Sequence, residues 1–154
     1  YSEYVVPSTG AGEGVARDGW TASQYIQAII EHLFGVDYDH LHKRLRVLPH
    51  IPKELLGQEI RLQNLQLPSS EHTTLDLYIT QTEDLETIVE IHISGPLPSV
   101  DLEVYLPETG LQEVRAMVDQ REYKTTIQRD VKGLDNIIGI KMPLAENTRL
   151  RFSK

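Results

Sequence analysis

From about residue 44 to the end of this 154-residue chain, apolar and polar residues alternate with a period of two. The alternation is clearest at residues 74–79 and 87–93, where Leu, Ile and Val alternate with Asp, Tyr, Glu, Thr and His. Successive side chains of a strand point to opposite faces of a sheet, so such a segment buries one face and exposes the other. The pattern predicts strands at Leu45–Leu48, Glu59–Leu67, Thr73–Thr80, Thr87–Ser94, Leu102–Leu106, Gln112–Val118, Tyr123–Gln128, Ile137–Met142 and Thr148–Phe152.

Turn-forming clusters such as Pro-Glu-Thr-Gly separate the predicted strands at intervals of about 8–12 residues. This spacing is typical of sandwiches and barrels rather than of folds that alternate strands with helices. We therefore predict a mainly β protein in which residues 44–154 form an antiparallel β-sandwich of about eight strands, because two half-apolar sheets must pack their apolar faces together.

The residues before this region follow a different pattern. Residues 7–19 hold four of the ten glycines and predict a loop. Residues 19–35 then predict one helix, with Thr21 and Gln24 as a capping box and Gly35 as its left-handed end. Its apolar face consists of Ala22, Ile26, Ile29, Ile30, Leu33 and Phe34. A single helix gains little from propensity alone, so the sheet or another partner is expected to cover this face.

Composition excludes several classes of function. The formal net charge is −8 with a pI near 5.2. The overall charge of the chain would therefore not attract nucleic acids or anionic membranes. The absence of cysteine excludes disulfides, iron–sulfur clusters and a thiol nucleophile, and leaves the compartment open. The chain begins at Tyr1 without a Met, so we expect a fragment or a processed product.

Histidines and glycines do not form a familiar catalytic or binding motif. His32, His40, His42 and His50 lie close in sequence but lack acidic or cysteine partners at a metal-binding spacing, so we predict solvated histidines and no metal site. There is no Gly-x-Ser-x-Gly nucleophile motif, and the glycines at positions 10, 12 and 14 do not match a dinucleotide-binding loop.

Carboxylates near the amino terminus are the remaining candidates for chemistry. Glu3 lies between Tyr1 and Tyr4, and Glu13 lies within the glycine-rich loop, so either could be partly buried at a cleft and act as a general base. The alternative for each is a solvated surface charge. Trp20, the only tryptophan, could stack on a sugar or anchor the start of the helix in the core.

Residues 2–22, SEYVVPSTGAGEGVARDGWTA, resemble the closing stretch of the six-hairpin, or (α/α)6-barrel, glycoside hydrolases. The resemblance is to glycoside hydrolase family 63 and its glucosidase and mannosylglycerate-hydrolase relatives. In that family a Glu followed by aromatic residues, a Pro-x-Thr-Gly, a glycine loop and Gly-Trp-Thr/Ser-Ala lead into one of the last barrel helices. Residues 34–36, 45–49 and 51–55 also look like the junction between such a barrel and a carboxyl-terminal β-domain.

The resemblance implies a function. Glu3 matches the general base of an inverting hydrolase of α-glycosides, while Trp20 and Gly12 would form part of the sugar pocket. Residues 1–43 would be the terminal segment of the barrel and residues 44–154 a supporting β-sandwich. The general acid would be an Asp upstream of Tyr1. The implied partners are the carbohydrate substrate and the rest of the barrel or a second copy, with no cofactor, nucleic acid or membrane.

A non-catalytic sandwich that binds carbohydrate or protein is the alternative function. Exposed aromatic residues on a flat sheet would favour sugar binding, but the predicted sandwich holds only Tyr78, Tyr105, Tyr123 and Phe152 and no Trp. A sandwich that only supports the barrel is the simplest interpretation of residues 44–154.

Overall fold

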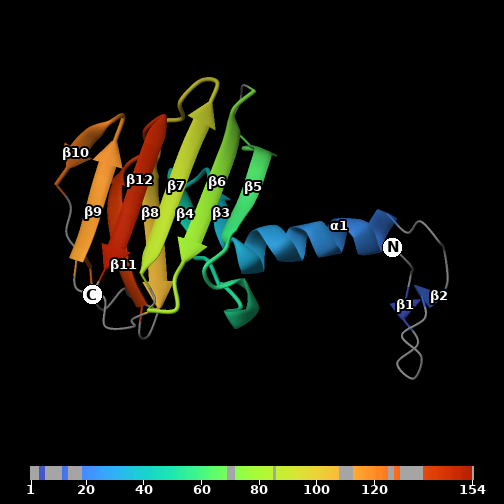
Figure 1. Ribbon diagram of the computed structural model, residues 1–154. Coiled ribbons are helices and arrows are strands. Elements are labelled where there is room, and N and C mark those ends of the chain that lie inside the picture. Colours follow the sequence, from blue (N-terminus) through green and yellow to red (C-terminus); the bar gives the residue numbers. More distant parts are fainter. Residues whose placement is uncertain are drawn as a thin grey trace.

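The protein is described by a computed structural model that covers residues 4–5, 12–13, 19–68, 72–84, 86–107, 113–124, 127–128 and 137–153. Two β-sheets form its body, and a helix projects from that body (Figure 1). A short hairpin of β1 (Tyr4–Val5) and β2 (Gly12–Glu13) precedes the helix in the chain. The mainly β class predicted from the sequence is confirmed.

The larger sheet has six strands, and every neighbouring pair in it is antiparallel. Its spatial order is β10 (Arg121–Tyr123), β9 (Glu113–Val118), β12 (Asn147–Ser153), β7 (Thr87–Ser94), β6 (Thr74–Gln81) and β5 (Glu59–Gln66). The smaller sheet has the order β11 (Ile137–Pro143), β8 (Asp101–Pro107), β4 (Arg44–Val47) and β3 (Val36–Asp39).

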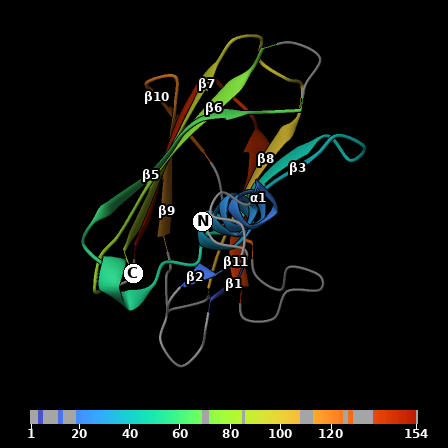
Figure 2. The same ribbon diagram turned by 90° about the vertical axis from the view of Figure 1, so that its right-hand side faces the viewer.

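Both sheets contribute their apolar faces to one hydrophobic core, and they lie on opposite sides of it (Figure 2). In β6 and β7 the buried residues alternate with more exposed ones, as the period-two pattern predicts. The fully buried side chains include Leu75, Leu77, Ile91 and Phe152 from the larger sheet and Leu45, Leu102, Ile138 and Ile140 from the smaller one. The arrangement is sandwich-like.

The prediction of antiparallel pairing is wrong for one pair. Strands β4 and β8 run parallel, with Leu45 opposite Leu102 and Val47 opposite Val104. The chain forms β4 in the smaller sheet, crosses to the larger sheet for β5, β6 and β7, and returns beside β4 in the same direction. Two strands joined by such a long crossover can be parallel, whereas a short hairpin requires antiparallel strands.

Two strand predictions near turns also differ from the structure. Strand β3 was not expected, because Val36–Asp39 is short and contains two aspartates. The strand expected at Tyr123–Gln128 instead ends at Tyr123, because the hairpin turns early, at Asp119 and Gln120, which both have positive φ. Gln128 forms only an isolated bridge with Gly139.

The predicted helix is present as α1 (Gly19–Ala28), which continues into a π-helical turn, η1 (Ile29–Leu33). Because α1 begins at Gly19, Thr21 lies inside the helix and is not its cap. Gly35 ends the helical segment with a φ of 63°, as predicted. A 3-10 turn, η2 (Lys53–Leu55), connects β4 to β5. None of the described helices has the length and apolar character that a membrane span requires.

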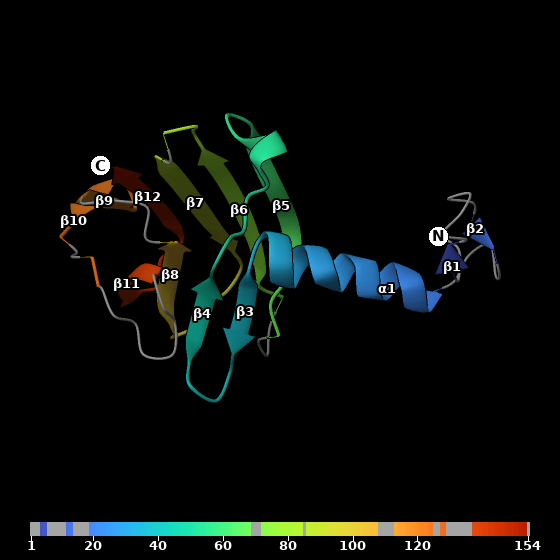
Figure 3. The ribbon, with the colours of Figure 1, turned by 90° about the horizontal axis from the view of Figure 1, so that it is seen from below.

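The helix docks on the sandwich only at its carboxyl-terminal end (Figure 3). Phe34 is 4% exposed, and Ile29, Ile30 and Leu33 pack partly buried against the core. Ile26, which belongs to the same predicted apolar face, is 53% exposed. The expected burial of this face is therefore confirmed for the last helical turn and wrong for Ile26.

Candidate functional site

The three residues predicted to form the sugar site lie in or before the hairpin and the first turn of α1. Glu3 lies outside the described residues. Gly12 pairs with Val5 in the hairpin, and the same pairing places Tyr4, the residue after Glu3, opposite Glu13. Trp20 belongs to the first turn of α1, and its side chain lies outside the description. The structure does not test whether these side chains meet, so their catalytic and binding roles stay predictions.

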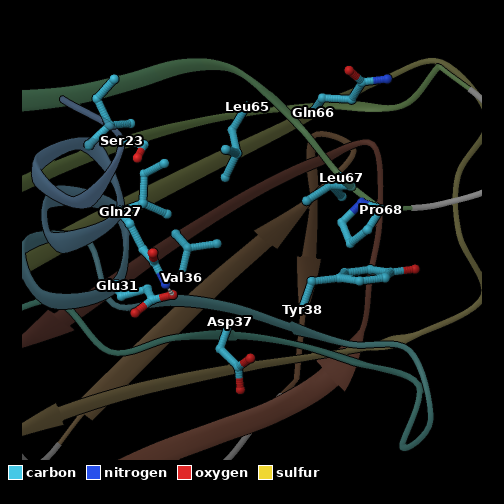
Figure 4. A pocket seen from close by; sticks show the side chains of 12 residues that line it. Ser23, Gln27, Glu31, Val36, Asp37, Tyr38, Leu65, Gln66, Leu67 and Pro68 are labelled. Carbon is cyan, nitrogen blue, oxygen red and sulfur yellow. Dashed lines mark hydrogen bonds between the residues drawn. The ribbon is translucent and has the colours of Figure 1, made fainter. Parts of the chain in front are cut away.

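A groove of about 450 Å³ lies where α1 meets the sandwich (Figure 4). One wall is the exposed face of the helix, with Ile26 and Ile30. The other walls come from the start of β3 and the end of β5, including Val36, Leu65 and Leu67. The groove exists because the helix leaves the sheets at this point. Among its apolar lining residues, Val36 and Leu67 are buried, whereas Ile26 is exposed and Leu65 is half-buried, so these two remain accessible to a partner.

Carboxylates border this apolar groove. The amide of Gln27 donates a hydrogen bond of 2.7 Å to Glu31, one helical turn further on. Asp37 at the start of β3 lies 3.7 Å from Arg46 on the neighbouring strand. Figure 4 shows the carboxylates of Glu31 and Asp37 at the groove's border. Apolar walls with a polar border are typical of a surface that packs against another part of a protein.

The segment that holds His40 and His42 forms a turn. Asp39 accepts hydrogen bonds from the backbone N–H of His42, at 2.9 Å, and from its ring Nδ1, at 2.7 Å. Arg44 lies 3.1 Å from the same carboxylate. The backbone hydrogen bond from His42, followed by the side-chain one, lowers the pKa of Asp39 to about 2. Within the described ranges, no three His, Cys, Asp or Glu residues are grouped closely enough to hold a metal ion.

Charges of alternating sign cross the outer face of the smaller sheet. The strand register places Asp37, Arg46, Glu103 and Lys141 side by side on four neighbouring strands. Lys141 lies 3.5 Å from Glu103, whose side chain is only 8% exposed. The sequence indicates a charged residue within an apolar strand at Glu103, but it does not show the order of the four strands that make the row.

Tyr105 completes this network. Its hydroxyl donates a hydrogen bond of 3.0 Å to Glu103, and the guanidinium of Arg46 lies 5.9 Å from the centre of its ring. Burial, and then the hydrogen bond to Glu103, raise the pKa of Tyr105. The ring lies so close to Gly139 on β11 that a Cβ there would be 2.3 Å from it. Apart from Nε of Arg46, which is buried without a hydrogen-bond partner among the described residues, these groups contact one another, so we interpret the network as a structural surface.

Comparison with known proteins does not assign the chain to a family. No family model matches the sequence, and no curated protein shows significant similarity to it.

Proposed function

We propose that this chain is the carboxyl-terminal part of an inverting six-hairpin glycoside hydrolase that acts on α-glycosides. Residues 1–43 complete its (α/α)6 barrel, and residues 44–154 form an antiparallel-rich β-sandwich that supports the barrel. The observation that carries the proposal is the helix α1, which is anchored in the sandwich at its carboxyl-terminal end and exposes Tyr25 and Ile26 before that anchor.

A partner that packs against α1 would bury its exposed apolar side chains. Tyr25 and Ile26 are each 53% exposed, and the groove beside Ile26 has further apolar walls. Burying one large apolar side chain is worth about 1.5–3 kcal/mol, so covering this face would stabilise an assembled protein substantially. Neighbouring helices of a barrel are the partner that the resemblance implies, and they would pack along α1 and into the groove.

The proposed chemistry rests on Glu3. An inverting glycoside hydrolase needs two carboxyl groups roughly 6.5–9.5 Å apart, one to protonate the leaving oxygen and one to deprotonate the attacking water. Glu3 supplies the general base, and an Asp from the preceding part of the barrel supplies the general acid. Trp20 and Gly12 form part of the wall of the sugar pocket. Residues 1–154 alone lack the acid and are therefore expected to be inactive.

Turnover by the longest natural chain that contains residues 1–154 tests this proposal. The substrates are a panel of α-glucosides and α-mannosyl conjugates. Glu3→Gln keeps the shape of the side chain and removes its basicity, so we expect kcat to fall by about 10²–10⁴-fold while substrate binding is retained. Glu13→Gln is the matched control, because it makes the same change at the other candidate carboxylate near the amino terminus, and it should turn over like the parent when Glu3 is the base. A Glu3→Gln variant as fast as the parent, or a parent without activity on the panel, would overturn the proposal.

The aromatic residues of the sandwich give little support to the alternative of a flat sugar-binding sheet. Tyr105 and Phe152 are buried, and Tyr78 is half-buried. Tyr123 is 38% exposed, but it lies on the edge strand β10. A flat aromatic platform needs several exposed rings on one face, which these residues do not form.

A further inference from the structure

A small hollow of about 320 Å³ lies on the outer face of the larger sheet, the face toward the viewer in Figure 1. It is formed by β7, β12 and β9 together with the turn that follows β9. Two strands, β6 and β5, separate it from the edge of the sheet where α1 and its groove lie. A partner that covers the helix would therefore leave this hollow open.

The strand register brings the polar side chains of the hollow together in two rows. Glu90 lies opposite Arg149, and His92 lies opposite Asn147. Met117 is opposite Arg149 on the next strand and is 39% exposed, so it provides an apolar surface beside the polar groups. The hollow thus combines an apolar contact surface with planar polar side chains.

The side chains of the hollow are held in place before any ligand arrives. The Nδ1 atom of His92 lies 2.8 Å from Oδ1 of Asn147, and the edge of the Tyr78 ring packs against the imidazole with the ring centres 5.6 Å apart. Because Oδ1 can only accept, Nδ1 is the donor in this hydrogen bond. Arg149 contacts Glu90 at 3.1 Å.

The turn after β9 is also fixed relative to the hollow. The backbone N–H of Asn147 donates to the carboxylate of Asp119 at 3.0 Å, and the N–H of Asp119 donates to the carbonyl of Asn147 at 2.8 Å. Gln120, which lines the hollow, follows Asp119 with a φ of 67°. Binding therefore requires little ordering of the backbone, which favours affinity for a small ligand.

We propose that this hollow binds the terminal sugar unit of a neutral carbohydrate. The carboxylate of Glu90 is matched by the guanidinium of Arg149, so the site does not favour a strongly charged ligand. Carboxylate, guanidinium, amide and imidazole groups offer donors and acceptors to neighbouring hydroxyls, while Met117 contacts the C–H face of the sugar ring. The volume is at the lower end of the range for small-molecule sites, about 300–1,000 Å³, which suits one or two sugar units. This site does not depend on Glu3 or on the proposed reaction.

Titration of the 154-residue chain with methyl α-D-glucopyranoside and methyl α-D-mannopyranoside, followed by amide NMR, tests the proposal. We expect saturable shifts of Glu90, His92, Met117 and Asn147 with at least one of the two sugars. A lack of saturable shifts up to ~100 mM, where a millimolar Kd would be saturated, would overturn it. Shifts confined to other parts of the chain would do the same.

Variants identify the binding residues. His92→Ala removes a polar wall and should weaken binding at least tenfold, with a small fall in the urea midpoint because the contacts with Asn147 and Tyr78 are lost. Met117→Ala removes the apolar surface that contacts the sugar ring without removing a hydrogen bond and should also weaken binding, so it decides the case if His92→Ala fails to fold. Arg115→Ala is the matched control, since Arg115 is an exposed residue of β9 that pairs with Glu113 outside the hollow. Equal weakening by the control, or full binding by Met117→Ala, would contradict the assignment. Neither result bears on the turnover test of Glu3.

Discussion

Replacing Gly35 with alanine should loosen the anchor that joins the helix to the sandwich. Gly35 links η1 to β3 with a φ of 63°, a conformation that L-residues rarely adopt. Its carbonyl accepts a hydrogen bond of 3.0 Å from the N–H of Leu48. A Cβ at this position would lie 1.8 Å from the carbonyl oxygen of Leu48 and 2.2 Å from its carbonyl carbon, so the backbone must shift.

Two contributions set the size of the effect. The left-handed conformation disfavours alanine by about 1–2 kcal/mol. Moving Leu48 away also disturbs its hydrogen bond to Gly35 and the neighbouring one from the N–H of His50 to the carbonyl of Leu33, each worth about 0.5–1.5 kcal/mol. We therefore expect Gly35→Ala to lower the free energy of unfolding by about 2–5 kcal/mol in total.

Gly57 is a matched control for the close approach. Its φ is 76°, so alanine meets a similar conformational penalty there, but a Cβ would have no heavy atom within 4 Å. Gly57→Ala should therefore lower the free energy of unfolding by only about 1–2 kcal/mol. The difference between the two variants measures the contact of Gly35 with Leu48.

Urea denaturation followed by circular dichroism gives the free energy of unfolding of the parent and both variants. The comparison is valid where the three chains share the same dependence of free energy on urea. Equal losses for Gly35→Ala and Gly57→Ala would refute the reasoning, because the close contact with Leu48 would then have no energetic consequence.

Three further predictions concern polar groups. Because the pKa of Asp39 is lowered to about 2, its interaction with His42 should stabilise the fold above about pH 4 and weaken as the pH falls toward 2. Asp39→Asn should therefore destabilise at pH 7 and make much less difference at pH 2 in thermal unfolding. Tyr105→Phe removes a donor from the buried carboxylate of Glu103 and should lower the free energy of urea unfolding by about 1–3 kcal/mol. Thr148→Val should raise the free energy of urea unfolding by up to ~1–3 kcal/mol, because the buried Oγ1 has no hydrogen-bond partner among the described residues. An unchanged or lower free energy of unfolding would contradict this.

The sequence by itself determined the features that depend on local pattern. Strands β6 and β7 were predicted to within a residue of their observed ends, because burial of one face imposes the period-two alternation on the residues themselves. The end of the helix at Gly35 was likewise predictable, because a left-handed residue after an apolar helical segment favours glycine. The candidates Glu3, Gly12 and Trp20 rest on resemblance, and the described residues do not test their roles.

Only the tertiary structure decided which strands are neighbours and in which register. The parallel pairing of β4 with β8, the charged row through Glu103 and the hollow beside His92 each combine residues from strands that are far apart in the sequence. Alternation shows which face of a strand is buried, but many strand orders bury the same faces equally well. The choice among those orders depends on packing across the whole core. The same choice sets the positions of the polar side chains on the outer faces.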